Sequence, residues 1–189
     1  GKSSIGKVLS RLTGQGYLDT DQLIEDATGK KIPQIFESEG ESGFREIEQH
    51  VIARIPSGAG IISTGGGAVI RPDNVRMLRM NSIVVLLNSS PEVIYKRIHK
   101  TDRPSLTGLS PRDEIDLVLK ERMPIYRSAA DIVIDTSTTT SEEAARQILN
   151  LVENGICVPE KRNELFASVM KTAIPAGEKI HLKKISGDN

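Results

Sequence analysis

The chain begins with glycine, lysine and two serines, Gly1, Lys2, Ser3 and Ser4, a run that suits phosphate binding. In a complete phosphate-binding loop, G-x-x-x-x-G-K-[ST], backbone N–H groups surround the phosphates, the lysine reaches the β- and γ-phosphates, and the hydroxyl binds Mg²⁺. Only the last three positions of this pattern are present. The run points to nucleotide phosphoryl transfer, although a tripeptide this short also occurs by chance.

Two carboxylates, Asp19 and Asp21, follow the short apolar pair Tyr17 and Leu18. Ligands of an α/β sheet bind at the carboxyl ends of its strands, so both acids would face a ligand if the apolar pair is a strand. One acid could then lie near Mg²⁺ and the other could accept a proton from a substrate hydroxyl. A solvated turn with a helix cap explains the same D-x-D spacing.

Three glycines, Gly65, Gly66 and Gly67, come directly after the apolar run at residues 60–64. Without Cβ atoms, their backbone N–H groups can approach a ligand closely. The alternative is a plain tight turn.

Four arginines, Arg45, Arg97, Arg103 and Arg127, are candidates for recognising carboxylate or phosphate, because a guanidinium offers a planar fork of donors. Each could equally be a solvent-exposed side chain. His50, His99 and His181 show no metal-ligand spacing, so the histidines are assigned no role.

Short apolar runs alternate with amphipathic stretches, which indicates an α/β protein with a parallel sheet. We expect strands at 17–18, 60–64, 83–87 and 132–134, and helices at 5–12, at 44–55, from 91, from 111 and at 141–153. The strand at 83–87 is apolar throughout, which predicts burial on both faces. Ser90, Ser110 and Thr140 are the expected helix caps. Residues 100–111 are loop-like and are expected to form a mobile lid.

Composition excludes several classes of function. Lys plus Arg and Asp plus Glu are both 25, so the formal net charge is zero and nothing favours a nucleic-acid or anionic-membrane partner. Aromatic residues make up 3%, with no tryptophan, so base-stacking surfaces are not expected. The single cysteine, Cys157, excludes an internal disulfide framework and favours a reducing compartment.

Taken together, the motifs resemble the shikimate kinase family over about residues 1–153. They occur in the order G-K-S, L-D-T-D-x-x-I-E, F-R-x-I-E, G-G-G-A-V, R-P-S-L and P-x-Y-R. The resemblance implies a P-loop NTPase-like, five-stranded parallel sheet with helices on both faces, whose first, central strand would precede Gly1. We therefore expect the natural protein to carry about ten more N-terminal residues, or another segment to take the place of that strand, since a missing buried strand would cost more than the roughly 5–15 kcal/mol stability of a domain.

The resemblance also assigns roles to the substrate side of the site. Asp21 corresponds to the acid that binds the shikimate hydroxyls and is the expected base. Arg45 and Arg127 correspond to residues that pair with the shikimate carboxylate, and Glu48 to an acid that orients the first of these arginines. The three glycines at 65–67 correspond to the loop that lines shikimate and the γ-phosphate.

On the nucleotide side, the resemblance implies that Ser3 and Asp19 hold Mg²⁺. Lys2 and Arg103 would act on the transferring phosphoryl group, the latter from the lid, and Arg97 would pack against adenine. The implied nucleotide-binding residues are Gly1, Lys2, Ser3, Ser4, Arg97 and Arg103. Mg²⁺ would be the cofactor, with ATP as co-substrate.

The predicted domain spans residues 1–155, with a substrate-binding segment at about 19–55 and the lid at about 100–111. Residues 156–189 are expected to form an extension or linker that can lead into a further fused domain. The resemblance implies a cytoplasmic enzyme of aromatic amino-acid biosynthesis, or a plastid one if the source is a plant. The alternatives are a non-catalytic kinase-like domain that senses a ligand, and a related small-molecule kinase such as gluconate kinase.

Overall fold

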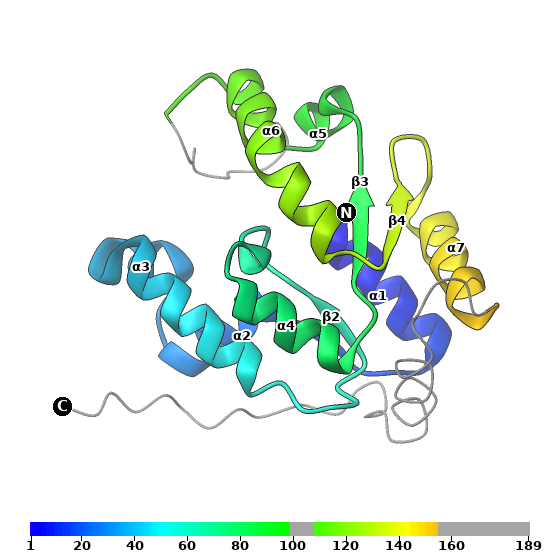
Figure 1. Cartoon of the computed structure of the whole chain (residues 1–189), viewed down its shortest axis with the longest axis horizontal. Coiled ribbons are helices and arrows are strands. Elements are labelled where there is room, and N and C mark those ends of the chain that lie inside the picture. Colours follow the sequence, from blue (N-terminus) through cyan, green and yellow to red (C-terminus); the bar gives the residue numbers. More distant parts are fainter. Residues whose placement is uncertain (99–107, 155–189) are drawn as a thin grey trace.

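The structure is a computed structural model and describes residues 1–98 and 108–154 (Figure 1). Helices and short strands alternate along the chain, which confirms the α/β class expected from the sequence. The elements are α1 (Lys2–Thr13), β1 (Tyr17–Asp19), α2 (Thr20–Thr28), α3 (Ile32–Ala53), β2 (Ile61–Ser63), the 3₁₀ turn η1 (Ala68–Ile70), α4 (Pro72–Asn81), β3 (Val85–Asn88), α5 (Pro91–Ile98), α6 (Pro111–Ala129), β4 (Ile132–Asp135) and α7 (Ser141–Glu153).

The four strands pair in parallel as two separate two-stranded sheets, β1 with β2 and β3 with β4. In the first pair Asp19 lies opposite Ser63, and in the second Asn88 lies opposite Asp135. The two strands of each pair therefore end at the same level, so the residues that follow them emerge at the same edge of the sheet. Within residues 1–98 and 108–154, β2 and β3 are not hydrogen-bonded to each other or to a strand between them.

The expectation that strand 83–87 is buried on both faces is wrong. All four residues of β3 are only half-buried. Among the described strands, β3 pairs with one neighbour alone, β4. A continuous apolar run gives no information about whether both neighbours of a strand are present.

All three expected helix caps form hydrogen bonds that begin their helices, and at the start of α5 the Val93 N–H donates to the Ser90 hydroxyl at 3.4 Å. The Asp113 N–H donates to the Ser110 hydroxyl at the start of α6. At the start of α7, the Glu143 N–H donates to the Thr140 hydroxyl while the Glu143 carboxylate accepts from the Thr140 N–H, which is a capping box. Such side-chain oxygens satisfy N–H groups that have no partner inside the helix.

The helices exceed the sequence expectation in three places: α2, the first half of α3, and α4. The expected helix at 44–55 is the second half of α3, which starts at Ile32 and contains a break at Gly40, where φ is +67°. Helix α4 was not expected; Pro72 stands in its first turn, where the missing N–H of proline costs no hydrogen bond.

Apolar side chains form two main clusters. One joins β1, α2 and α3 around Leu18, Ile24 and Phe44. The other joins α1, β4 and α7 around Ile5 and Ile134. Figure 1 shows the first group of helices and the second on different sides of the molecule, with β3 and α6 between them. The first cluster supports the residues expected to bind substrate, and the second supports the helix that begins with Lys2.

Some predictions lie outside the described residues. These are Arg103, most of the lid and the whole extension at 156–189, so the proposed division of the chain at residue 155 stays a prediction. In the part of the chain that the structure describes, no helix has the length and hydrophobicity needed to span a membrane.

Candidate active site

The level ends of β1 and β2 bring the acidic turn and the glycine turn together. The N–H of Gly65 donates to the hydroxyl of Thr20 at 3.0 Å, and Thr20 is completely buried. This bond joins the first turn of α2 to the loop that follows β2, although the two residues are 45 positions apart. The register of the strands thus fixes the position of Asp21 relative to the three glycines.

Asp21 and Glu48 both approach Gly65. A Cβ atom placed on Gly65 would lie 2.7 Å from Asp21 Oδ1 and 3.4 Å from Glu48 Oε1. The first distance is shorter than a non-bonded carbon–oxygen contact, so only glycine fits here without displacing the Asp21 carboxylate. Glycine is required at this position because the Asp21 carboxylate lies where a side chain would begin.

Arg45 and Glu48 form a buried ion pair on α3. Arg45 Nη1 donates to Glu48 Oε2 at 2.9 Å, and the Glu48 side chain is 1% exposed. The guanidinium also contacts Glu41, at 3.3 Å, and stands 5.2 Å from the centre of the Phe44 ring. A Cβ on Gly67 would collide with the same guanidinium. Arg45 is therefore held on several sides, next to the glycine turn.

Two buried polar atoms of this pair have no hydrogen-bond partner among the described residues: Arg45 Nε and Glu48 Oε1. Burial raises the pKa of the Glu48 carboxyl, with the nearby Asp21 carboxylate acting in the same direction and the Arg45 guanidinium opposing both. Orphaned buried groups carry a desolvation penalty unless a ligand or water pairs with them. The network of Asp21, Arg45, Glu48 and Gly65 to Gly67 is called the acid–arginine network below.

Asp19 accepts three hydrogen bonds. Its Oδ1 accepts from the Asp21 N–H at 3.1 Å, which makes it the cap of α2. Its Oδ2 accepts from the Ser3 hydroxyl at 3.2 Å and from the Tyr17 hydroxyl at 3.1 Å. Burial is the main cause that raises the pKa of the Tyr17 phenol, which therefore stays protonated and remains a donor at neutral pH. The structure thus brings Ser3 and Asp19 together, as the magnesium prediction requires.

The start of α1 is open to solvent. Gly1, Lys2, Ser3 and Ser4 are all exposed, and Gly1 caps the helix without a side-chain hydrogen bond. Arg97 reaches this end of the molecule: a Cβ on Gly1 would lie 3.8 Å from its Nη1. The same guanidinium donates to the Thr136 carbonyl at 2.8 Å. A cation and exposed N–H groups at a helix N-terminus are favourable surroundings for phosphate.

A cleft of about 310 Å³ lies between β3 and α6 and reaches both the glycine turn and the start of α1. Lys2 and Gly66 line it, together with Arg122 and Tyr126 of α6. The Tyr126 hydroxyl donates to the Gly66 carbonyl at 2.7 Å, which ties α6 to the glycine turn. Apolar side chains such as Leu119 and Met123 form much of the remaining wall.

Arg127, the predicted second substrate arginine, is exposed on α6 and takes part in none of the ion pairs of the described residues. The cleft instead contains Arg122, which sequence reasoning missed. Residues four apart lie on one face of a helix, so Arg122 shares a face with Tyr126. Arg127 follows Tyr126 directly and is therefore turned by about 100° from Tyr126 around the helix axis. The signal was present in the sequence as the helical spacing of Arg122 and Tyr126.

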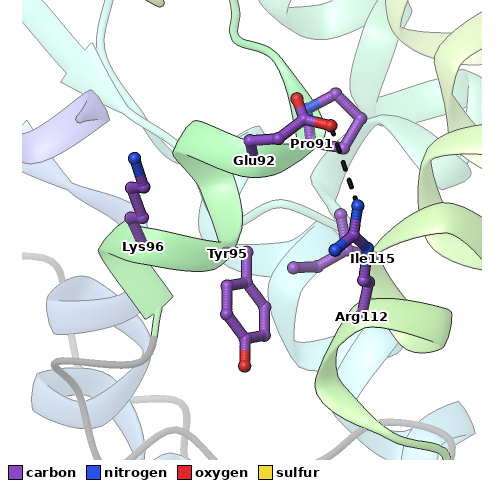
Figure 2. A pocket seen from close by; sticks show the side chains of 6 residues that line it. All are labelled: Pro91, Glu92, Tyr95, Lys96, Arg112 and Ile115. Carbon is purple, nitrogen blue, oxygen red and sulfur yellow. Dashed lines mark ion pairs between the residues drawn. The ribbon is translucent and has the colours of Figure 1, made fainter.

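A second, smaller cavity of about 160 Å³ lies between α5 and α6 (Figure 2). Its lining includes Tyr95 and Lys96, and Glu92 faces Arg112 across it with 4.0 Å between the charged atoms. It shares Ile115 with the larger cleft but contains none of the predicted site residues. We assign it no part in the chemistry.

The oxygen atoms near Asp19 suit a hard cation. No cluster of three or more His, Cys, Asp or Glu residues exists within residues 1–98 and 108–154. Mg²⁺ in nucleotide sites commonly takes only one or two protein oxygens and fills its other positions with phosphate and water. The Ser3 hydroxyl beside the Asp19 carboxylate fits that arrangement.

An α/β fold with a lysine-containing helix start beside an acidic strand end defines a small-molecule phosphotransferase of the P-loop NTPase-like class. The family model for shikimate kinase matches residues 1–153. The chain belongs to the shikimate kinase family.

Individual relatives agree with the family match. The chain is 42% identical to the shikimate kinase of Nitrosococcus oceani over 151 residues, covering 79% of this chain and 80% of that protein. It is 40% identical to the shikimate kinase of Thermodesulfovibrio yellowstonii over 155 residues, with 81% and 89% covered.

Solved structures give the same result. The shikimate kinase of Acinetobacter baumannii in complex with shikimate superimposes with a TM-score of 0.76 at 35% identity, over 82% of this chain and 88% of that one. The shikimate kinase of Aquifex aeolicus matches with a TM-score of 0.69 at 32% identity, over 82% and 92%.

Proposed function

We propose that this chain transfers the γ-phosphoryl group of ATP to the 3-hydroxyl of shikimate, giving shikimate 3-phosphate and ADP in aromatic amino-acid biosynthesis. The acid–arginine network carries the proposal: a carboxylate, a buried guanidinium and orphaned polar atoms meet at a glycine turn. A small acid with several hydroxyls is the kind of ligand that could pair with all of them. The similarity to a structure with shikimate bound supports this choice.

On the substrate side, Asp21 binds the hydroxyls and accepts the proton of the attacking one. Arg45 pairs with the substrate carboxylate beside the glycine turn, while Glu48 holds its guanidinium at 2.9 Å. Gly65 and Gly67 leave the space in which these side chains lie. Positioning of this kind is the main task of the protein in phosphoryl transfer, because the reaction needs little covalent help.

The second arginine can be chosen by experiment. The family resemblance assigns the shikimate carboxylate to Arg127, whereas the cleft contains Arg122. We propose Arg122 as the second partner of the carboxylate and keep Arg127 as the alternative. If Arg122 is the partner, Arg122→Leu raises the KM for shikimate by about tenfold or more, the cost of a lost charged hydrogen bond, and Arg127→Leu has a smaller effect. If Arg127→Leu instead raises the KM for shikimate more than Arg122→Leu does, Arg127 is the partner of the carboxylate.

On the nucleotide side, Lys2 lies beside the β- and γ-phosphates and Arg97 beside adenine. Gly1 and Ser4 offer N–H groups at the start of α1, and Arg103 acts from the predicted lid. Ser3 and Asp19 would hold Mg²⁺. When bound, the metal would neutralise charge on the phosphates. The chain's own residues orient the two substrates and exclude water from between them.

The direct test is to incubate the purified full-length protein, including the N-terminal residues expected before Gly1, with ATP, MgCl₂ and shikimate and to identify the product by mass spectrometry. We expect shikimate 3-phosphate and ADP in equal amounts, and no phosphorylated product from gluconate. Shikimate binding without phosphate transfer would select the ligand-sensing alternative. The cytoplasmic location and the further fused domain stay predictions.

A further inference from the structure

The proposed reaction gives no role to the side chain of Tyr17. Tyr17 is the first residue of β1, and its hydroxyl donates to Asp19 Oδ2 at 3.1 Å. Ser63, whose side chain is buried, lies opposite Asp19 in the sheet. Tyr17 therefore holds Asp19 at the edge where the ligands would bind.

The Tyr17 ring is held there by α1. A Cβ on Gly6 would lie only 2.7 Å from Cε2 of the ring and 3.6 Å from Ile61 Cγ2. Gly6 is buried inside α1, one turn after Ser3. The ring therefore occupies space that any larger residue at position 6 would take, and this packing aims the hydroxyl at Asp19.

A bound metal would affect the two hydrogen-bond donors to Asp19 Oδ2, Ser3 and Tyr17, in different ways. The Ser3 oxygen is itself a metal ligand in the proposed function, so its hydroxyl hydrogen must turn away from any cation that it binds. Tyr17 reaches Oδ2 from the β1 side and can keep its hydrogen bond while the metal is present. Asp19 Oδ1 is engaged by the Asp21 N–H. Tyr17 and the cap bond together fix both oxygens of the carboxylate.

We propose that Tyr17 is a positioning residue that holds the Asp19 carboxylate in the orientation that binds the magnesium of the nucleotide. This inference rests on the proposed function for the identity of the metal site. It assigns Tyr17 no contact with ATP or shikimate. Its role is to reduce the freedom of Asp19, so its loss weakens metal binding and leaves shikimate binding intact.

The test uses Mn²⁺ as the probe metal, with ADP present and shikimate absent, and reads free Mn²⁺ by electron paramagnetic resonance. We expect Tyr17→Phe, which keeps the ring and removes the hydroxyl, to raise the Kd for Mn²⁺ about fivefold, as expected for one lost hydrogen bond. Calorimetric titration with shikimate should give the same Kd for the variant and the unchanged chain. Gly6→Ala, which moves the ring but keeps the hydroxyl, should weaken Mn²⁺ binding in the same direction.

Tyr95→Phe is the matched control, because Tyr95 belongs to the separate cavity between α5 and α6 and loses the same atom. It should leave Mn²⁺ binding unchanged. In an Asp19→Asn background, Tyr17→Phe should add nothing, because Tyr17 acts through that carboxylate. Equal effects in both backgrounds, or unaltered Mn²⁺ binding by Tyr17→Phe, would overturn the inference.

This result is separable from that of the proposed function. A chain that binds Mn²⁺ with ADP but does not phosphorylate shikimate contradicts the proposed function and leaves the Tyr17 measurement intact. A chain that binds no Mn²⁺ in the presence of ADP overturns the assignment to Tyr17 as well. Circular dichroism on each variant verifies that the fold is retained.

Discussion

The acid–arginine network and the start of α1 are both candidate halves of one active site, but they are built differently. Glu48 is 1% exposed and Arg45 13%, and each is fixed by neighbours on more than one side. Lys2, Ser3 and Ser4 are all exposed at a helix end. One half is organised by buried side chains, and the other lies at the N-terminal end of α1.

This difference indicates in which part of the site substrate selectivity is coupled to the stability of the fold. A buried ion pair is costly to break, since removal of one partner leaves the other charge unpaired in a poorly hydrated site. Changes in the acid–arginine network should therefore affect folding and substrate recognition together. Changes at exposed cations should affect ligand affinity with little effect on the free energy of unfolding.

The largest expected effect comes from Asp21→Asn. It removes the base that accepts the hydroxyl proton, so kcat should fall by about 10²- to 10⁴-fold, the usual contribution of general base catalysis. Steady-state kinetics gives kcat, and calorimetry should show that shikimate binding is partly kept. Asp26→Asn, on the exposed side of the same helix, is the matched control and should have little effect. An unchanged kcat for Asp21→Asn would show that the base is misassigned.

Alanine substitutions in the glycine turn should give the next largest effects, in an order set by the space at each position. Gly67→Ala collides with the Arg45 guanidinium and should raise the KM for shikimate by about tenfold to a hundredfold. Gly65→Ala displaces Asp21 and should mainly lower kcat. Gly66→Ala should be mildest, since its nearest neighbour, the Tyr126 hydroxyl, is 3.8 Å away. Equal effects at all three positions would contradict the geometry of the turn.

Arg97→Ala tests the exposed half and should have a smaller effect. Loss of this cation near Gly1 should weaken ADP binding about three- to tenfold, the range for one lost hydrogen bond to a charged group. The melting temperature and the Kd for shikimate should stay close to those of the unchanged chain. Arg11→Ala, which breaks an exposed ion pair with Glu142, provides the control. A weakened shikimate affinity in Arg97→Ala would indicate that the two halves are coupled.

The smallest effect is the pH dependence that Glu48 contributes to stability. Burial raises the pKa of Glu48 above its ordinary 4.5, so the folded state holds the proton more tightly than the unfolded state does. That contribution is complete below the ordinary pKa and is lost as pH rises through the raised value. Glu48→Gln stays neutral, so its melting temperature relative to the unchanged chain should rise as the pH increases above the ordinary pKa of 4.5. A difference that is constant with pH would show that folding does not shift the pKa of Glu48.

Local patterns predicted the elements and part of the site. The strands at 17–18 and 132–134, the helix caps at Ser110 and Thr140, and the neighbourhood of Asp21 with the three glycines follow from short-range sequence signals and strand register. Caps and strand ends are determined by a few adjacent residues, so they can be found without tertiary information.

Other features depend on tertiary structure. The half-burial of β3 depends on which strands flank it, and the choice between Arg122 and Arg127 depends on the rotational phase of α6. The hydrogen bond from Tyr17 to Asp19 joins two side chains on the same strand, and the space for that ring is left by Gly6 on another element. Spacing within a motif does not reveal such contacts.

The capping role of Asp19 has a consequence for mutational surveys. One oxygen of its carboxylate starts α2 and the other faces Ser3, so the position is constrained by two different requirements. Asn, Ser and Thr also cap helices, so these replacements should preserve cellular abundance of the protein. Only a carboxylate keeps the charge that faces Ser3. A scan that scores abundance and growth separately should therefore find position 19 permissive in the first measurement and restricted in the second.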